Sequence, residues 1–144
     1  MRVASIHLAP GTRLSTRPVD AVEAEAGKGL VGDRYHGSRH RQVTVQSRTA
    51  LDQAAAKLGY EFDSGATRRN ITVDAGDIPT TPGARLRIGD VELEVVRVAA
   101  PCRLMEEAVG PGATAALRGR AGSACRVLTS GTIRVGDRVE LLDE

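Results

Sequence analysis

The sequence predicts a mainly β protein: a small, partly closed β-barrel with one or two short helices. Short apolar runs rich in β-branched residues recur along the chain, and 16 glycines and 6 prolines punctuate them as tight turns require. The glycines follow no repeating period, which excludes collagen-like and solenoid architectures. With 144 residues, 41% of them hydrophobic, the chain suffices for one core, so we expect a single domain over residues 1–144.

The first forty residues contain two expected strands and one long loop. Apolar residues over 3–8 predict a strand that ends at the turn pair Pro10-Gly11, and the loose alternation over 18–25 predicts a second strand. Between residues 27 and 41 apolar side chains nearly vanish while glycines and charges accumulate. This composition is typical of a long shaped loop, and such loops often carry function.

The next segment predicts a strand, a helix and another strand. Residues 42–46 alternate with a period of two, and Ser47 is suited to cap a helix with an apolar face that Gly59 ends. Residues 70–73 form a further short strand.

The C-terminal half predicts hairpins around one helical region. Residues 85–98 hold two strands joined by the turn Gly89-Asp90, and residues 102–118 are helical or irregular, broken at 110–112. Strands follow at 125–128 and 133–142, and Gly136-Asp137 is predicted to be a second hairpin turn.

Composition narrows the function classes. The net charge is only +2, aromatic residues make up 2% and tryptophan is absent, so few platforms exist on which bases could stack and nucleic-acid binding is disfavoured. The N-terminus lacks the apolar region of a signal peptide and the length of a membrane span, so we expect a cytoplasmic protein without a membrane partner. The two cysteines are expected to be free thiols, and no CxxC or Cys/His cluster indicates zinc.

The glycine-rich segment 29–37 is the first candidate site. Closely spaced glycines, Gly32 among them, let the backbone approach a ligand, beside the acid of Asp33 and the guanidinium of Arg34. The alternative is a surface loop in which Asp33 and Arg34 pair with each other. His36 and His40 are four residues apart without a helical pattern, so a surface role is favoured over a metal pair.

Arginines at two strand mouths form the second candidate site. Arg68, Arg69 and Asn70 precede one expected strand, and Arg41 precedes another. Guanidinium and amide groups suit phosphate or a planar heterocycle, and the two mouths could share one cavity. A solvated charged turn is the alternative.

Cys102 is the third candidate. It follows Pro101 after an expected strand, and Arg103 beside it favours the thiolate, which suits a soft metal ligand or a sulfur carrier. The alternative is a small core residue, which we expect for Cys125 within its apolar strand.

Seven motifs, taken in order, resemble those of the MOSC domain family, named after the C-terminal domain of molybdenum cofactor sulfurases. The resemblance spans nearly the whole chain. The motifs are Gly29-Leu30-x-Gly32-Asp33-Arg34, Arg41-Gln42-Val43-Thr44-Val45, Arg69-Asn70-Ile71-Thr72-Val73, Gly83-Ala84-x-Leu86-x-Ile88-Gly89, Pro101-Cys102, Gly122, and Arg126-Val127-Leu128 through Gly131-Thr132-Ile133-x-x-Gly136-Asp137.

The resemblance implies a barrel-like fold that binds the pterin-based molybdenum cofactor (molybdopterin), with Cys102 as molybdenum ligand or sulfur carrier. The implied function is reduction of N-hydroxylated or related small molecules with an external electron donor; a non-catalytic carrier of sulfur or of the cofactor, independent of pyridoxal phosphate, is the alternative. Because Met1 opens at the first expected strand and the chain stops at Glu144, we expect a separate redox partner or a cysteine desulfurase. A plain anion-binding or nucleic-acid-binding barrel is the third reading. Together with the residue patterns, the resemblance assigns cofactor binding to Gly32, Asp33, Arg34, His36, Arg41, Arg68, Arg69, Asn70 and Arg103.

Overall fold

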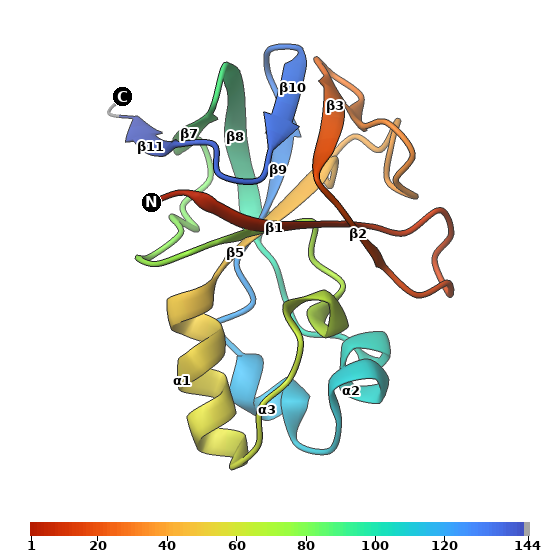
Figure 1. Cartoon of the computed structure of the whole chain (residues 1–144), viewed down its shortest axis with the longest axis vertical. Coiled ribbons are helices and arrows are strands. Elements are labelled where there is room, and N and C mark those ends of the chain that lie inside the picture. The colour runs from red at the N-terminus through yellow and green to blue at the C-terminus, as the bar shows by residue number, and fades with distance from the viewer. Residues whose placement is uncertain (143–144) are drawn as a thin grey trace.

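The computed structural model describes residues 1–142 and arranges them as a curled β-sheet with a group of helices at one end (Figure 1). The large sheet has eight strands in the order β11-β7-β8-β9-β5-β6-β1-β2. These strands are β1 (Val3–Leu8), β2 (Arg17–Val19), β5 (Val43–Ser47), β6 (Ile71–Val73), β7 (Arg85–Ile88), β8 (Val91–Val98), β9 (Ser123–Val127) and β11 (Val139–Leu142).

A smaller three-stranded sheet and four helical segments complete the fold. The small sheet has the order β10-β3-β4 and consists of β3 (Ala21–Glu25), β4 (Gly29–Leu30) and β10 (Gly131–Arg134). The helices are α1 (Arg48–Leu58), α2 (Arg103–Val109) and α3 (Ala113–Leu117), with a 3₁₀-helix η1 (Ser64–Thr67).

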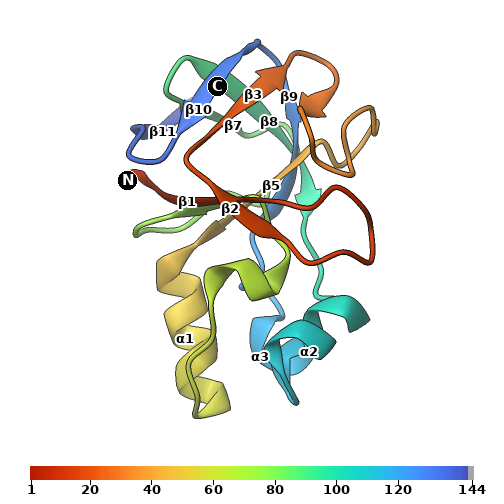
Figure 2. The same ribbon diagram turned by 45° about the vertical axis from the view of Figure 1, so that its right-hand side comes forward.

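Backbone hydrogen bonds bring the two ends of the large sheet together. The Val3 amide donates to the Asp137 carbonyl at 2.9 Å, the Gly136 amide donates to the Val3 carbonyl at 2.8 Å, and the Val139 amide donates to the Met1 carbonyl at 2.8 Å. The start of β1 therefore lies beside the start of β11, as both ribbon views show (Figures 1 and 2). This closure confirms the predicted partly closed barrel.

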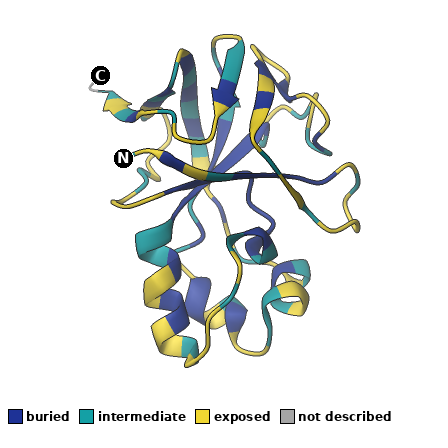
Figure 3. Cartoon of the chain, viewed as in Figure 1, coloured by how far each residue is buried: buried dark blue, intermediate teal, exposed yellow. Residues whose placement is uncertain are grey.

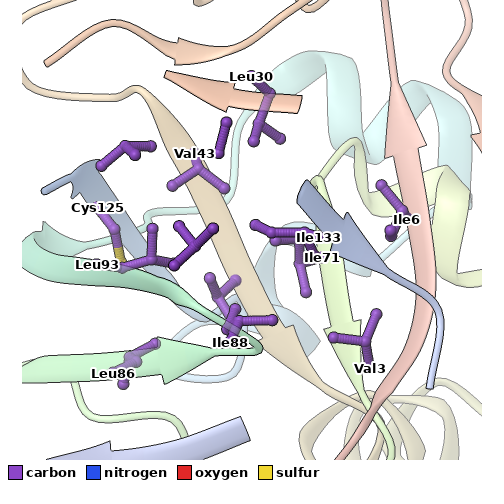
Figure 4. Packing of buried hydrophobic residues seen from close by; sticks show 14 of the residues in the cluster. Val3, Ile6, Leu30, Val43, Ile71, Leu86, Ile88, Leu93, Cys125 and Ile133 are labelled. Carbon is purple, nitrogen blue, oxygen red and sulfur yellow. The ribbon is translucent and has the colours of Figure 1, made fainter. Parts of the chain in front are cut away.

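The barrel interior is filled by apolar side chains of both sheets (Figure 4). Along β8, Val91, Leu93 and Val95 are buried while the residues between them are partly exposed, which is the alternation of a strand with one face on the core. Cys125 of β9 is fully buried in the same cluster, and burial raises the pKa of its thiol to about 12. The expected core role of Cys125 is thus confirmed.

The helices pack through a second apolar cluster below the barrel, and their outer faces are exposed (Figure 3). Helix α1 begins and ends where the sequence predicts: the Ser47 hydroxyl accepts from the Thr49 amide at 3.1 Å, and Gly59 (φ 80°) caps the C-terminus. No helix in residues 1–142 is both long enough and apolar enough to cross a membrane.

Four sequence-based expectations need correction. The segment 18–25 forms two strands, because the chain bends at Asp20 and β2 pairs with β1 while β3 joins the small sheet. Gly136-Asp137 is a turn but no hairpin turn, since β10 pairs with β3 and β11 with β7. The expected loop 27–41 contains the short strand β4. Residues 103–117 form two helices, so the described chain has three α-helices instead of one or two.

Candidate functional site

The only parallel strand pair in residues 1–142 brings two arginines to one edge of the sheet. Strands β5 and β6 run in the same direction with Val45 opposite Ile71, and α1 and η1 form the crossover between them. Parallel neighbours begin at the same edge, so Arg41 before β5 and Arg69 before β6 lie close together. The expectation that the two strand mouths share a cavity is met by this pairing.

A cavity of about 400 Å³ opens at this edge, and we call it the arginine cavity. The loops 9–16 and 31–41 and the start of α2 lie on this side of the molecule in both ribbon views (Figures 1 and 2). Six arginines and Cys102 contribute to its wall. The lining residues are Thr12, Arg13, Arg34, Tyr35, Arg41, Arg68, Arg69, Cys102, Arg103, Leu104 and Glu107.

Tyr35 organises two of these arginines. The guanidinium carbon of Arg34 lies 4.5 Å from the ring centroid, and that of Arg41 lies 4.8 Å from it. The π face of the ring attracts both cations and offsets part of their mutual repulsion. The Nε atoms of Arg34 and Arg41 are buried without a hydrogen-bond partner among the described residues.

Arg69 is the most deeply buried of the cavity arginines, with an exposed fraction of 0%. Its Nε donates to the Ala121 carbonyl at 3.1 Å and its Nη2 to the Ala100 carbonyl at 2.8 Å, while Nη1 has no partner among residues 1–142. Burial, and next the charge of Arg41, lower the pKa of Arg69 to about 10, which still leaves it protonated at neutral pH. An anion in the cavity would supply the missing acceptor and relieve the repulsion.

Arg68 holds a wall of the cavity in place. Its Nη1 donates to the Leu14 carbonyl at 2.9 Å and its Nη2 to the Thr12 carbonyl at 2.6 Å, so it fastens the loop after β1. Among residues 1–142 it is the only non-glycine residue with a positive φ (66°). Such strained backbone conformations occur at functional sites more often than elsewhere. Burial, followed by the charge of Arg34, lowers the pKa of Arg68.

Cys102 lies at the mouth of the arginine cavity and is exposed. It is the N-cap residue of α2, three residues beyond the end of the β8 ladder at Ala99, and Arg103 is the first residue of the helix. The thiol also borders a second groove of about 470 Å³ that Glu106, Glu107 and Thr114 line. Cys102 can therefore be reached by a molecule inside the arginine cavity and by one approaching from α2.

Four of the predicted residues lie outside the cavity lining. Asn70 is buried and accepts from the Thr44 amide at 3.0 Å, which locks β6 to β5. Asp33 accepts from the Ala9 amide at 3.1 Å and pairs with Arg34 at 3.4 Å, as the surface-loop alternative proposed. His36 is exposed, and its Nε2 lies 3.0 Å from Oε1 of Glu25. Gly32, whose φ is 91°, contributes only a turn of the backbone.

The sequence reasoning did not single out Tyr35, Thr12, Arg13, Leu104 or Glu107. Tyr35 carried a signal, because it is one of only two tyrosines and stands between candidate residues in the glycine-rich segment. Thr12 and Arg13 carried no such signal in the sequence, since they line the cavity only because Arg68 holds their loop against it. Among residues 1–142, no group of three or more His, Cys, Asp or Glu side chains is arranged to hold a metal ion.

Comparison with known proteins identifies the family. The sequence model of the MOSC domain matches residues 32–140. The chain belongs to the MOSC domain family. The matched range contains Arg34, Tyr35, Arg41, Arg68, Arg69 and Cys102, so most of the arginine cavity lies within this MOSC domain.

Solved structures with this MOSC fold are similar at low sequence identity. The YuaD protein of Bacillus subtilis aligns with a TM-score of 0.83 at 18% identity, covering 96% of this chain and 93% of that one. YiiM of Geobacillus stearothermophilus aligns with a TM-score of 0.77 at 21% identity over 99% of this chain and 75% of that one. YiiM of Escherichia coli gives 0.76 at 18% identity, covering 100% and 71% respectively. These likenesses establish the fold, and a search of curated proteins found no significant match.

Proposed function

We propose that this MOSC protein binds the molybdenum cofactor in the arginine cavity and reduces N-hydroxylated or related small molecules with electrons from a separate reductase. One observation carries the proposal: an exposed thiol and six guanidinium groups line a single cavity. Arginine side chains suit phosphate and planar heterocycles, and a thiolate suits a soft metal centre.

The residues of the cavity fit the chemistry of such a cofactor. The buried N–H groups of Arg34, Arg41 and Arg69 that lack partners within residues 1–142 are donors for phosphate and for ring carbonyl or nitrogen acceptors. The Tyr35 ring contacts the guanidiniums of Arg34 and Arg41 and thereby helps to orient them. Arg68 contributes differently, since its own donors are taken by the loop after β1, and it shapes the wall that faces the cofactor.

Cys102 would hold molybdenum through its sulfur, because it is the exposed thiol on this wall whereas Cys125 is sealed in the core. When bound, the cofactor supplies the oxygen-transfer chemistry. Reduction of an N-hydroxyl group to an amine consumes a pair of electrons and a pair of protons and releases water. The chain itself provides binding, orientation and a positive potential that stabilises anionic groups near the thiol. Free thiols fit a reducing compartment, so we place this activity in the cytoplasm.

Elemental analysis tests the proposal. The full chain, produced in a host that makes the cofactor, should carry molybdenum in a near-stoichiometric amount. Cys102→Ala should lose most of it, whereas the matched variant Cys125→Ala, which alters a thiol outside the cavity, should retain it. Equal molybdenum content in wild type and Cys102→Ala would exclude Cys102 as the metal ligand.

A carrier role is the second candidate, and the exposure of Cys102 toward the groove beside α2 favours it. A partner could reach the thiol there, and the Cys102 thiolate would attack the outer sulfur of a desulfurase persulfide, leaving a persulfide on Cys102 and a thiolate on the donor. Intact mass spectrometry after incubation with a cysteine desulfurase and cysteine should then show one added sulfur on wild type and none on Cys102→Ala. An unmodified wild type would rule out the sulfur-carrier form.

A further inference from the structure

The position of Cys102 depends on an irregular stretch of chain. The ladder between β8 and β9 ends where the Ala99 amide donates to the Gly122 carbonyl at 2.9 Å. Helical bonding begins where the Glu106 amide donates to the Cys102 carbonyl at 3.1 Å. Neither Ala100 nor Pro101 belongs to a strand or a helix, so some other contact must fix the path to the thiol.

We propose that Arg69 is the positioning residue for Cys102, through a guanidinium that ties the carbonyl of Ala100 to that of Ala121. Nη2 donates to Ala100 at 2.8 Å and Nε donates to Ala121 at 3.1 Å. The guanidinium is planar, so its two N–H bonds hold the two carbonyls in a fixed relation. The tie therefore joins the segment that leads to Cys102 to the segment that leads into β9.

The anchor of this tie is rigid. Arg69 precedes β6 and is fully buried, and the next residue, Asn70, is locked to β5 by the bond from the Thr44 amide at 3.0 Å. Arg69 is thereby fixed to the parallel strand pair at the bottom of the arginine cavity. The hydrogen bond from Arg69 thus adds to the β8–β9 ladder and to the packing of α2 in holding the thiol relative to that strand pair.

The other cavity arginines do not share this role. Arg34 donates to Asp33 and to the Arg68 carbonyl, and Arg68 donates to the loop after β1. Among the hydrogen bonds of residues 1–142, none from another cavity arginine reaches residues 99–102. Arg41 lines the same wall and contributes charge, yet it makes no such tie, which makes it the natural control.

The tie also links the thiol to the contents of the cavity. Nη1 of Arg69 has no hydrogen-bond partner in the described part of the chain, so the guanidinium that positions Cys102 still offers an N–H group to a bound anion. One residue then sets both the place of the anion and the place of the sulfur. This role rests on the proposed function of Cys102, since positioning matters only if the thiol acts.

Hydrogen exchange on the full chain, read by mass spectrometry, tests the tie. Arg69→Met, which removes charge and donors at similar side-chain length, should raise exchange in a peptide over residues 99–105 about tenfold, the effect of losing a charged hydrogen bond. Arg41→Met removes a neighbouring charge without touching this segment and should leave that peptide unchanged. Peptides from α1 should be unaffected in both variants.

The reactivity of Cys102 gives a second readout. The limiting rate of alkylation by iodoacetamide at high pH reports the position of the thiol. Arg41→Met should leave this limiting rate unchanged, whereas Arg69→Met should change it by about threefold or more, since an untied segment samples other positions. If Arg69→Met does not fold, Arg69→Lys serves in its place, because one ammonium cannot reproduce the planar pair of donors.

The outcomes separate this proposal from that of the cofactor. Exchange over residues 99–105 that stays at the wild-type level in the Arg69 variant, or rises equally in Arg41→Met, would overturn the positioning role. A wild-type protein without molybdenum would instead overturn the proposed function and leave the exchange result standing.

Discussion

Gly122 offers the sharpest test of how this fold supports its site. Its φ is 80°, and a Cβ added there would lie 1.8 Å from the Val45 carbonyl oxygen and 2.9 Å from the Gln46 Cα. Strands β5 and β9 would have to separate where Val45 lies opposite Ser123. The Gly122 carbonyl also accepts from the Ala99 amide, so the same shift disturbs the approach to Cys102.

The expected destabilisation of Gly122→Ala follows from two terms. The left-handed backbone conformation costs a non-glycine residue about 1 to 2 kcal/mol. Separating the strands loses about three backbone hydrogen bonds at about 1 kcal/mol each. The total of about 4 to 5 kcal/mol is a large part of the stability of a domain, about 5 to 15 kcal/mol, so Gly122→Ala should unfold at a much lower urea concentration than wild type.

Gly119 provides the matched control. Its φ is 75°, nearly that of Gly122, but an added Cβ would meet nothing within 4 Å. Gly119→Ala should therefore cost only the backbone term, about 1 to 2 kcal/mol. Urea unfolding followed by far-UV circular dichroism measures both variants. If the two free energies of unfolding agree within about 0.5 kcal/mol, the close approach at Gly122 does not govern stability and the reasoning fails.

Three further predictions follow from the site and the core. Arg68→Ala should free the loop after β1, so trypsin should cut after Arg13 several-fold faster than in wild type; an unchanged cleavage rate would refute the fastening role. Iodoacetamide at about pH 8 should label Cys102 alone in the folded protein and both cysteines in urea, because burial raises the pKa of Cys125 to about 12; labelling of both thiols in native protein would contradict this. Burial lowers the pKa of His7 below its ordinary value of 6.5. As the pH falls, His7 is therefore protonated in the unfolded chain before it is protonated in the folded chain. The free energy of unfolding should fall as the pH drops from about 7.5 to about 5.5. His7→Gln should flatten this fall, and equal pH slopes in the two proteins would count against it.

Local signals predicted most of the elements. Ser47 and Gly59 bound α1 because capping by a hydroxyl and by a left-handed glycine depends on neighbouring residues alone. The hairpin at Gly89-Asp90 formed as predicted for the same reason. Gly136-Asp137 has the same local character, but the strands it joins pair elsewhere, and pairing partners are chosen by the burial of whole faces.

The candidate site likewise combines features that local sequence indicates with features that only the fold decides. The sequence indicated that Arg41 and Arg69 could line one cavity, because both precede β-branched runs and guanidinium groups suit the same ligands. By residue type Asn70 was an equal candidate for ligand binding, but its side-chain oxygen accepts a hydrogen bond from the Thr44 amide between the strands. A side chain's chemistry is visible in the sequence, whereas whether its donors are already used depends on neighbours that the fold supplies.

The sequence by itself determined the MOSC family, the mainly β class and the residue types of the site, because motif order, strand periodicity and capping are properties of the chain read locally. The tertiary structure alone decided that six arginines share one cavity with Cys102, that the guanidiniums of two of them contact the Tyr35 ring, and that Arg69 ties the segment leading to the thiol. These facts depend on the parallel pairing of β5 with β6 and on the path of the loop after β1. Contacts across such separations are set by which surfaces are buried together, and no local pattern specifies them.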